Sequence, residues 1–384
     1  MSQGQSNQCV VERGIGSSAT VSTPPLPVAN AQAFHAEYIE VARLQTRLRT
    51  SLSGFLGIVY HGGTSGNTGG TGAIPVVSLD LPQLSDPPLA EVWTSPLPVT
   101  YHQAEGIHCA MNDEVLFGAL QVVEPPGALL DTVTYRAYRQ LLVQARALGY
   151  PHLLRVWNYF PSINSESDGL ERYQRFCAGR YQALAEGLEG FPRTLPAGTA
   201  VGTLSGPLTI HFLAAKHPGA HIENPRQVSA YEYPPVYGLR SPSFARATLR
   251  PSLSGAQLLI AGTASIVGHA SEHVGATYKQ TLEILHNLKV LIARTEQLHG
   301  IDRGQWLGRA LFKVYFRHPE HVVTIRDMLT ALLPSHAEVL YLQGEMCRSE
   351  LLVEIEAVRT QEQSVGVSQR GLNGSSVFSA TGRI

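Results

Sequence analysis

The residues best suited to chemistry lie close together near the C-terminus, between Cys347 and Glu354. This segment reads Cys-Arg-Ser-Glu-Leu-Leu-Val-Glu, so it combines a thiol, a guanidinium and two carboxyls. Apolar residues flank Glu354 on both sides. Burial among them would raise its pKa and make it a proton donor at neutral pH. An ordinary half-exposed strand also fits, because Glu354 and Glu356 share one face of a strand.

Arginine, rather than lysine, supplies most of the positive charge. The only lysines are Lys216, Lys279, Lys289 and Lys313, whereas lysine and arginine together number 29. The planar guanidinium suits bidentate recognition of carboxylates. This bias fits a carboxylate ligand but does not define a site by itself.

Cysteine and histidine spacing indicates neither a disulfide scaffold nor a metal site. The four cysteines form no Cys-x-x-Cys pair. Two histidine pairs, His217 with His221 and His269 with His273, have the spacing of helical zinc ligands but lack an evident third ligand. We expect structural roles for these histidines, with no metal and no cofactor.

The overall composition argues against several classes of protein. The chain has 384 residues, 43% hydrophobic content and a formal net charge of −1. It can build a sizeable core but has no polybasic surface for nucleic acid or an anionic membrane. No run approaches the ~18 apolar residues of a transmembrane helix. The first ten residues are polar, so we expect no signal peptide and a cytoplasmic protein.

Apolar periodicity predicts an α+β fold with an internal duplication. Helices are expected at residues 131–148, 168–188, 272–298 and 320–333, and strands at 152–160, 208–214, 310–317, 339–343 and 351–357. The order helix, aromatic strand, helix, strand therefore occurs twice. Leu-Arg-Val-Trp at 154–157 resembles Phe-Lys-Val-Tyr at 312–315. We predict two related units, each packing a sheet against helices.

The longest predicted helix is expected to have one apolar face. Its apolar residues Val274, Tyr278, Leu282, Leu285 and Ile292 recur at helical spacing. We predict that this face packs into the core of the second unit.

The second unit resembles the YjgF/RidA family. The expected strand at 258–264, the helix around 280–288 and the last strand at 354–357 match the pattern of that family. The resemblance implies that Arg348 occupies the position of an arginine that binds a substrate carboxylate. The interval from this arginine to the last strand is shorter than in typical members.

Longer runs resemble the chorismatases, whose C-terminal half is RidA-like. One is Arg-Val-Trp-Asn-Tyr-Phe-Pro-Ser-Ile-Asn at 155–164, and the others lie at 171–177, 222–231, 240–247 and 262–271. Runs of this length are more specific than a short motif. Residues 35–150 match less distinctively.

The resemblance implies a cofactor-independent enzyme that splits chorismate and releases its enolpyruvyl group as pyruvate. This cleavage needs a proton at the enol methylene carbon, and the resemblance selects Glu354 as the acid. The two carboxylates of the substrate require cationic partners, and tyrosine hydroxyls can donate further hydrogen bonds. The predicted substrate-binding residues are Arg348, Arg240, Tyr231, Tyr237 and, in reserve, Arg226.

Cys347 concerns the identity of the ring product. A cysteine at this position resembles the branch that makes 3-hydroxybenzoate. There the ring C4 hydroxyl displaces the pyruvate oxygen at C3, and the ring aromatises without added water. A thiol near the ring would hydrogen-bond that hydroxyl or assist removal of its proton. Our first prediction is therefore a 3-hydroxybenzoate synthase with Glu354 and Cys347 as catalytic residues.

Three alternatives stay open. A hydrolytic chorismatase would give 3,4-dihydroxycyclohexa-1,5-diene carboxylate and pyruvate, and product identity separates it. A RidA-like imine deaminase would act on small imino acids, but the additional length and the long runs argue against it. A metabolite-binding protein would release no pyruvate from chorismate.

The domain organisation is predicted from composition and from the repeated elements. We expect a flexible leader at 1–34, a RidA-like domain at 35–215, a second at 216–358 and a flexible tail at 359–384. The sequence leaves the oligomeric state open between a monomer and a small homo-oligomer.

Overall fold

The computed structural model describes residues 32–62, 72–252, 255–301 and 310–360. The leader and tail predicted at 1–34 and 359–384 lie almost entirely outside these residues. Within the described ranges, no helix is long and apolar enough to cross a membrane.

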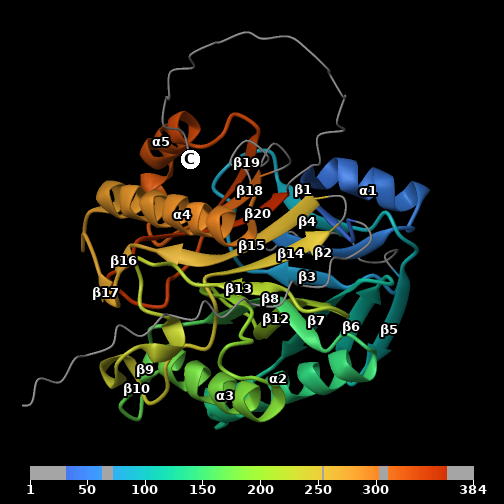
Figure 1. The fold of residues 1–384 in the computed structure, drawn as a ribbon, viewed down its shortest axis with the longest axis horizontal. Coiled ribbons are helices and arrows are strands. Elements are labelled where there is room, and N and C mark those ends of the chain that lie inside the picture. The colour runs from blue at the N-terminus through green and yellow to red at the C-terminus, as the bar shows by residue number, and fades with distance from the viewer. Residues whose placement is uncertain (1–31, 63–71, 253–254, 302–309, 361–384) are drawn as a thin grey trace, which may run out of the picture.

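Two sets of elements form the bulk of the molecule (Figure 1). The first set is β5 (Thr100–Ala104), β6 (Ile107–Met111), β7 (Val115–Val122), α2 (Leu130–Ala147), β8 (His152–Pro161), α3 (Arg172–Gly187), β11 (Ala197–Thr203) and β12 (Leu208–Ala215). The second set is β13 (Ala220–Ile222), β14 (Ala247–Ser252), β15 (Gly255–Ala264), α4 (Thr277–His299), β18 (Ala310–Phe316), α5 (Val322–Leu332), β19 (Ala337–Gln343) and β20 (Val353–Thr360). Two short hairpins are β9 (Glu166–Ser167) with β10 (Leu170–Glu171) and β16 (Ile266–Val267) with β17 (Ala270–Ser271).

The two sets have the same topology. The first sheet runs β11-β8-β12-β7-β6-β5, and the second, read from the matching edge, runs β19-β18-β20-β15-β14-β13. Only the pairs β11 with β8 and β19 with β18 are parallel in these two sheets; the other strand pairs are antiparallel. The predicted α+β fold with two related units is therefore confirmed. The domain boundaries drawn from the sequence remain a prediction.

A third, shorter version of the unit precedes these two and was not predicted. It contains β1 (His35–Glu40), α1 (Val41–Thr50), β2 (Phe55–His61), β3 (Val76–Leu79) and β4 (Leu89–Thr94). Its sheet runs β3-β2-β4-β1, with β2 parallel to β3 and the other pairs antiparallel. This order matches β11-β8-β12-β7 of the first unit. The described residues between β2 and β3 hold no second helix.

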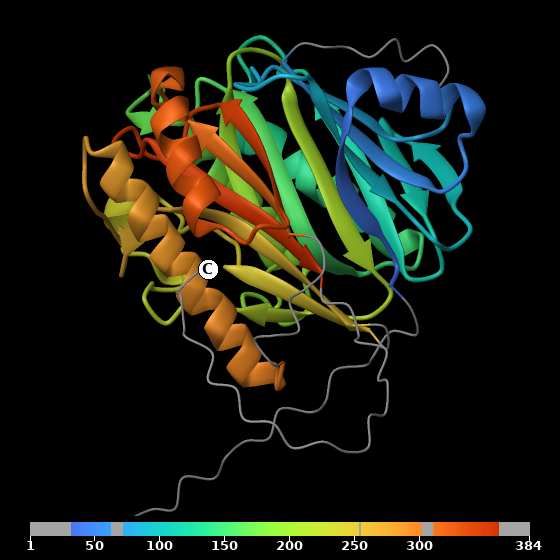
Figure 2. The same cartoon turned by 90° about the horizontal axis from the view of Figure 1, so that it is seen from above.

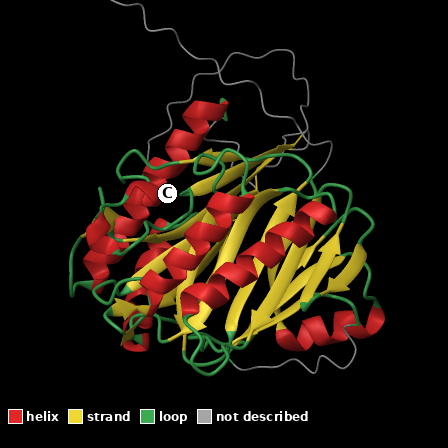
Figure 3. Cartoon of the chain, turned by 90° about the horizontal axis from the view of Figure 1, so that it is seen from below, coloured by secondary structure: helices red, strands yellow, loops and turns green. Residues whose placement is uncertain are grey.

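The sheets face a common core, and the helices lie outside. Figure 3 shows α2 and α3 lying across the outer face of the first sheet, and Figure 2 shows α4 and α5 along the second. One buried cluster draws side chains from all three sheets, including Val59, Trp93, Phe117, Trp157 and Tyr315. Side chains of neighbouring sheets therefore pack together in the interior, where residues from two units can form one site.

The predicted apolar face of the long helix is partly wrong. Leu285 and Ile292 are buried, but Val274, Tyr278 and Leu282 are 65%, 52% and 41% exposed. The helix also begins at Thr277, five residues later than predicted.

The buried face of α4 contains polar residues, which is why apolar spacing selected the wrong side. Gln280 donates to the Glu350 carbonyl (2.9 Å) and accepts from the Leu352 amide (2.8 Å). Asn287 donates to the Ile266 carbonyl (3.0 Å). Buried amides of this kind tie the helix to the loops beside it.

Candidate active site

A cavity of about 230 Å³ lies between the first and second units. The first unit contributes residues of α3 and β11, and the second contributes β15, β20 and the loops at 233–246 and 347–350. Of the seven residues proposed as catalytic or substrate-binding, four line this cavity: Glu354, Cys347, Arg348 and Tyr237.

Glu354 forms the buried wall of the cavity on β20. Its side chain is 4% exposed, and no hydrogen bond to its carboxyl occurs among the described residues. Gly262 on β15 makes room for it, because a Cβ at this position would overlap the Glu354 carboxyl. The pKa of Glu354 is raised to about 8, first by burial and then by Glu356, while Arg155 and Arg246 act in the opposite direction. Glu354 is therefore protonated at neutral pH.

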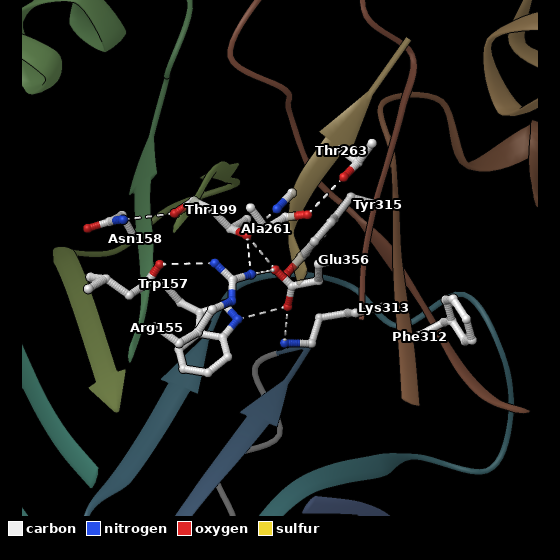
Figure 4. A network of polar contacts seen from close by, with 12 residues as sticks. Arg155, Trp157, Asn158, Thr199, Ala261, Thr263, Phe312, Lys313, Tyr315 and Glu356 are labelled. Atoms are coloured by element: carbon white, nitrogen blue, oxygen red, sulfur yellow. Dashed lines mark hydrogen bonds and ion pairs between the residues drawn. The ribbon is translucent and has the colours of Figure 1, made fainter. Parts of the chain in front are cut away.

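Glu356 has the opposite environment, although it lies only two residues away. Its carboxylate accepts from Trp157 Nε1 (2.9 Å), Arg155 Nη2 (2.8 Å) and Thr199 Oγ1 (2.6 Å), and Lys313 Nζ forms an ion pair with it (2.9 Å), as Figure 4 shows. Burial opposes its ionisation, but Lys313, Arg155 and the hydrogen bonds hold its pKa below the usual value. The strand thus carries an ionised and a protonated carboxyl side by side, the arrangement in which acid and base roles separate.

Two buried arginines that sequence reasoning missed point toward an anionic ligand. Arg180 on α3 is 2% exposed, and its Nε and Nη2 have no hydrogen-bond partner among the described residues. Gly198 leaves space for it, since a Cβ there would lie 2.6 Å from Nη2. Arg246 donates to the Tyr233 hydroxyl (2.8 Å) and the Val228 carbonyl (3.0 Å), and its Nε is also unpartnered. Unpaired buried N–H groups are costly, so they suit a carboxylate supplied by a ligand.

The loops hold Arg348 and Tyr237 against each other. The Arg348 guanidinium lies 3.9 Å from the centre of the Tyr237 ring and donates to Ser271 Oγ (3.0 Å) and to the His269 carbonyl (3.0 Å). The Tyr237 hydroxyl is 3.0 Å from His269 Nδ1. In the described residues neither Arg348, Arg246 nor Arg180 is ion-paired with a carboxylate. The cavity therefore keeps three guanidinium groups in its wall.

Cys347 lines the same cavity as a neutral thiol. Its pKa is raised to about 12, first by burial and then by the Glu354 carboxyl, whereas Arg348 acts in the opposite direction. A thiol in this state donates a weak hydrogen bond and is not a thiolate nucleophile. Of the two roles expected for Cys347, hydrogen bonding to a ring hydroxyl fits this environment better than proton removal.

The other three predicted binding residues do not line the cavity. Arg226 pairs with Glu283 (2.6 Å) and lies beside α4. Arg240 is exposed, with its guanidinium 4.7 Å from the centre of the Tyr181 ring. Tyr231 packs against the apolar core of the first unit. Their assignment to substrate binding stays a prediction that the cavity does not support.

The histidine pairs make contacts within the protein. His221 Nδ1 lies 3.1 Å from Thr248 Oγ1, and its pKa is lowered to about 4, first by burial and then by His152. His273 pairs with Glu283 (3.3 Å). Across the described ranges, no three His, Cys, Asp or Glu side chains gather as metal ligands.

Arg180 had a detectable signal in the sequence. Phe176, Arg180 and Leu184 recur every four residues, so they lie on one helix face. All three are buried. A charged residue on an otherwise apolar face is a candidate ligand-binding residue, and this criterion would have identified Arg180.

Comparison with known proteins gives consistent matches. A family described as "Chorismatase FkbO/Hyg5-like, N-terminal" matches residues 91–214. The chain is 36% identical over 292 residues to a 3-hydroxybenzoate synthase of Streptomyces hygroscopicus, covering 74% of this chain and 85% of that protein. It is 38% identical over 308 residues to a chorismatase of the same organism, covering 79% and 88%.

A solved structure agrees with these sequence matches. A crystal structure of a chorismatase superposes with a TM-score of 0.77 at 36% identity. The match covers 85% of this chain and 98% of that chain. The likeness therefore extends over most of this chain and nearly all of that structure.

Proposed function

Because the chain belongs to the chorismatase family, we propose that it converts chorismate to 3-hydroxybenzoate and pyruvate. The observation that carries this proposal is Glu354, a protonated carboxyl facing a cavity lined by three arginines. Chorismate is a dicarboxylate with an acid-labile enol ether, so it requires both features.

The arginines supply recognition of the substrate. Arg180 and Arg246 have unpartnered buried N–H groups, and each can donate to a carboxylate without breaking an internal hydrogen bond. Arg348 already donates to Ser271 and His269, so its main contribution to substrate binding is its positive charge. Two carboxylates bound by these groups would fix the enolpyruvyl side chain relative to Glu354.

Glu354 supplies the proton that breaks the ether. Its proton passes to the enol methylene carbon, which becomes the methyl group of pyruvate, and an oxocarbenium ion forms. The bond between ring C3 and the ether oxygen then breaks, and this oxygen leaves as the ketone oxygen of pyruvate. General acid catalysis of this kind contributes roughly 10²- to 10⁴-fold.

The ring completes the reaction without added water. The C4 hydroxyl oxygen bonds to C3 as the C3–O bond breaks, and its proton returns to the Glu354 carboxylate. The resulting arene oxide opens by breaking its C4–O bond, so the oxygen stays on C3. Loss of the C3 hydrogen as a proton then gives 3-hydroxybenzoate. All atoms of chorismate are then accounted for in the two products, and no oxidant or reductant is consumed.

Cys347 supports the intramolecular route over hydrolysis. Its neutral thiol lies in the wall that also contains Glu354, where it can hold the C4 hydroxyl by a hydrogen bond. The hydrolytic route instead requires a water molecule at C3 or at the oxocarbenium carbon. It would yield the dihydroxycyclohexadiene carboxylate, which keeps both ring hydroxyls.

Incubation of the purified protein with chorismate tests the proposal. Pyruvate is followed by a lactate dehydrogenase coupled assay, and the ring product is identified by chromatography and mass spectrometry. We expect equimolar pyruvate and 3-hydroxybenzoate without added metal or cofactor. Equimolar dihydroxycyclohexadiene carboxylate would replace the proposal with hydrolysis, and absence of pyruvate would reject the activity.

A further inference from the structure

Thr199 is one of the residues through which the two units touch beside the cavity. It belongs to β11 of the first unit, is 2% exposed and lines the cavity. Its hydroxyl donates to Glu356 Oε2 (2.6 Å) and accepts from Arg155 Nη2 and from the Gly262 amide (2.9 Å). Glu356 and Gly262 belong to the second unit, so one hydroxyl joins both units (Figure 4).

This hydroxyl has no remaining capacity for Glu354. A threonine hydroxyl has one proton and two acceptor sites, and all three are used by the contacts just described. Glu354 lies next to it, because the position of a Gly262 Cβ would be 3.2 Å from Thr199 Cγ2 and would also overlap the Glu354 carboxyl. Thr199 therefore presents its methyl group to the region of Glu354 and its proton to Glu356.

The Gly262 amide, which donates to Thr199, lies at an irregularity in β15. The pairing of β15 with β20 shifts register between Ile260 and Thr263, which includes Gly262. Bulges of this kind re-aim neighbouring side chains. Holding the Gly262 amide fixes the bulge, and the bulge leaves the gap that the Glu354 carboxyl occupies.

We propose that Thr199 is a positioning residue for Glu354. Its hydroxyl donates to Glu356 and accepts from the Gly262 amide, so neither the hydroxyl nor the amide is left to hydrogen-bond the Glu354 carboxyl. Glu354 therefore stays protonated and directed into the cavity. The proposal rests on the proposed function for its catalytic meaning. The charged or titratable groups around Glu354 are Glu356 on the same strand, Arg155 on β8, Arg246 before β14 and Cys347 in the adjoining loop.

Thr199→Val removes the hydroxyl but nearly keeps the side-chain volume. The Gly262 amide then loses its acceptor and becomes a donor beside the Glu354 carboxyl. Because hydrogen bonds to the ionised form lower a carboxyl pKa, we expect the pKa of Glu354 to fall by about one unit. We also expect kcat to fall roughly 10- to 100-fold through misplacement of the acid, with a much smaller change in KM.

Two matched variants separate positioning from general stability. Thr199→Ser keeps the hydroxyl and should retain kcat within about threefold, because the donor and both acceptor sites persist. Thr203→Val makes the same substitution on the same strand. The Thr203 hydroxyl is buried and has no hydrogen-bond partner among the described residues, so this change should leave both kcat and the pKa of Glu354 unchanged.

Infrared titration of the protonated Glu354 carboxyl gives a readout that does not require turnover. The band is assigned by its loss in Glu354→Gln and followed against pH in each variant. We expect a lower midpoint in Thr199→Val and the wild-type midpoint in Thr199→Ser and Thr203→Val. An unchanged midpoint in Thr199→Val would overturn the inference, as would an equal shift in Thr203→Val.

The two proposals fail in distinguishable ways. If the wild-type protein releases no pyruvate from chorismate, the proposed function fails, and the infrared midpoints alone decide the role of Thr199. If pyruvate is released but Thr199→Val keeps wild-type kcat and midpoint, only the positioning role is rejected. A lower melting temperature in both Thr199 variants with unchanged midpoints would mark a purely structural residue, which also rejects it.

Discussion

The two matching units place very different side chains at the same position of the fold. Trp157 of the first unit pairs with His211, whereas Tyr315 at the matching position of the second unit pairs with Glu354. His211 is fully buried, stacked 4.6 Å from the Trp157 ring and flanked by Phe117. Burial, followed by Lys313 and Arg155, holds the pKa of His211 well below its usual value.

The difference shows what turns a shared strand position into a site. Glu354 meets a cavity because small residues, including Gly262 on its own sheet and Gly198 on β11, leave space around it. At His211 aromatic rings fill the corresponding space. The fold supplies an inward-facing position in both units, but only the second unit joins it to an opening lined by arginines.

Removal of the acidic group should have the largest effect on turnover, because Glu354 is the residue that distinguishes the second unit from the first. Glu354→Gln keeps the shape of the side chain but cannot deliver a proton, so kcat should fall about 10³-fold. The exposed Glu189→Gln is the matched control and should retain full activity. Pyruvate release measured under saturating chorismate checks both, and near-normal turnover in Glu354→Gln would remove Glu354 from the mechanism.

Replacement of Arg180 tests whether the cavity binds a carboxylate. Arg180→Met removes the buried, unpartnered N–H groups, so KM should rise about 10- to 100-fold, with a smaller effect on kcat. Arg193→Met, at an exposed position, is the control. Steady-state kinetics with chorismate provide the measurement. Equal KM values in the two variants would contradict a binding role for Arg180.

The pH profile sharpens the comparison between the two carboxyls. Glu354 must be protonated to act, and its pKa is raised to about 8 by burial. Activity should therefore be full below this pKa and fall about tenfold per unit above it. The profile of kcat/KM in the free enzyme checks this. A basic limb near the ordinary carboxyl pKa would mean that Glu354 is as solvated as a surface residue.

Cys347 should have the smallest effect on rate and a specific effect on product. Cys347→Ala removes the thiol expected to hold the C4 hydroxyl, so part of the product should shift from 3-hydroxybenzoate to dihydroxycyclohexadiene carboxylate. Total pyruvate release should fall less than about tenfold, because a neutral thiol donates only a weak hydrogen bond. Chromatography of the ring products provides the measurement. An unchanged 3-hydroxybenzoate yield would remove Cys347 from product control.

Much of the fold followed from sequence periodicity, and the exceptions have physical reasons. The strand at 152–160 and the helix at 131–148 agree with β8 and α2 within one residue. The third unit was missed because α1 has only ten residues and no second helix is described in that unit. The buried face of α4 was misassigned because Gln280 and Asn287 take core positions through hydrogen bonds that apolar spacing does not register.

The sequence predicted the site residues that are close together in the chain. It missed the site residues that the first unit contributes. Cys347, Arg348 and Glu354 lie within eight residues and all line the cavity. Arg180 and Thr199 belong to the first unit, about 150 to 170 residues earlier in the chain, and the packing of the first unit against the second brings them close to the segment. The choice of Arg240 and Arg226 reflected the family resemblance without knowledge of that interface.

Reaction in heavy water tests the central claim most directly. If Glu354 delivers the proton, its exchangeable proton is replaced by deuterium, and each pyruvate should carry one deuterium in its methyl group. Immediate reduction to lactate prevents later exchange, and mass spectrometry counts the label. Pyruvate without deuterium would contradict the account, because the hydrogen would then have moved within the substrate and no acid on the protein would be required.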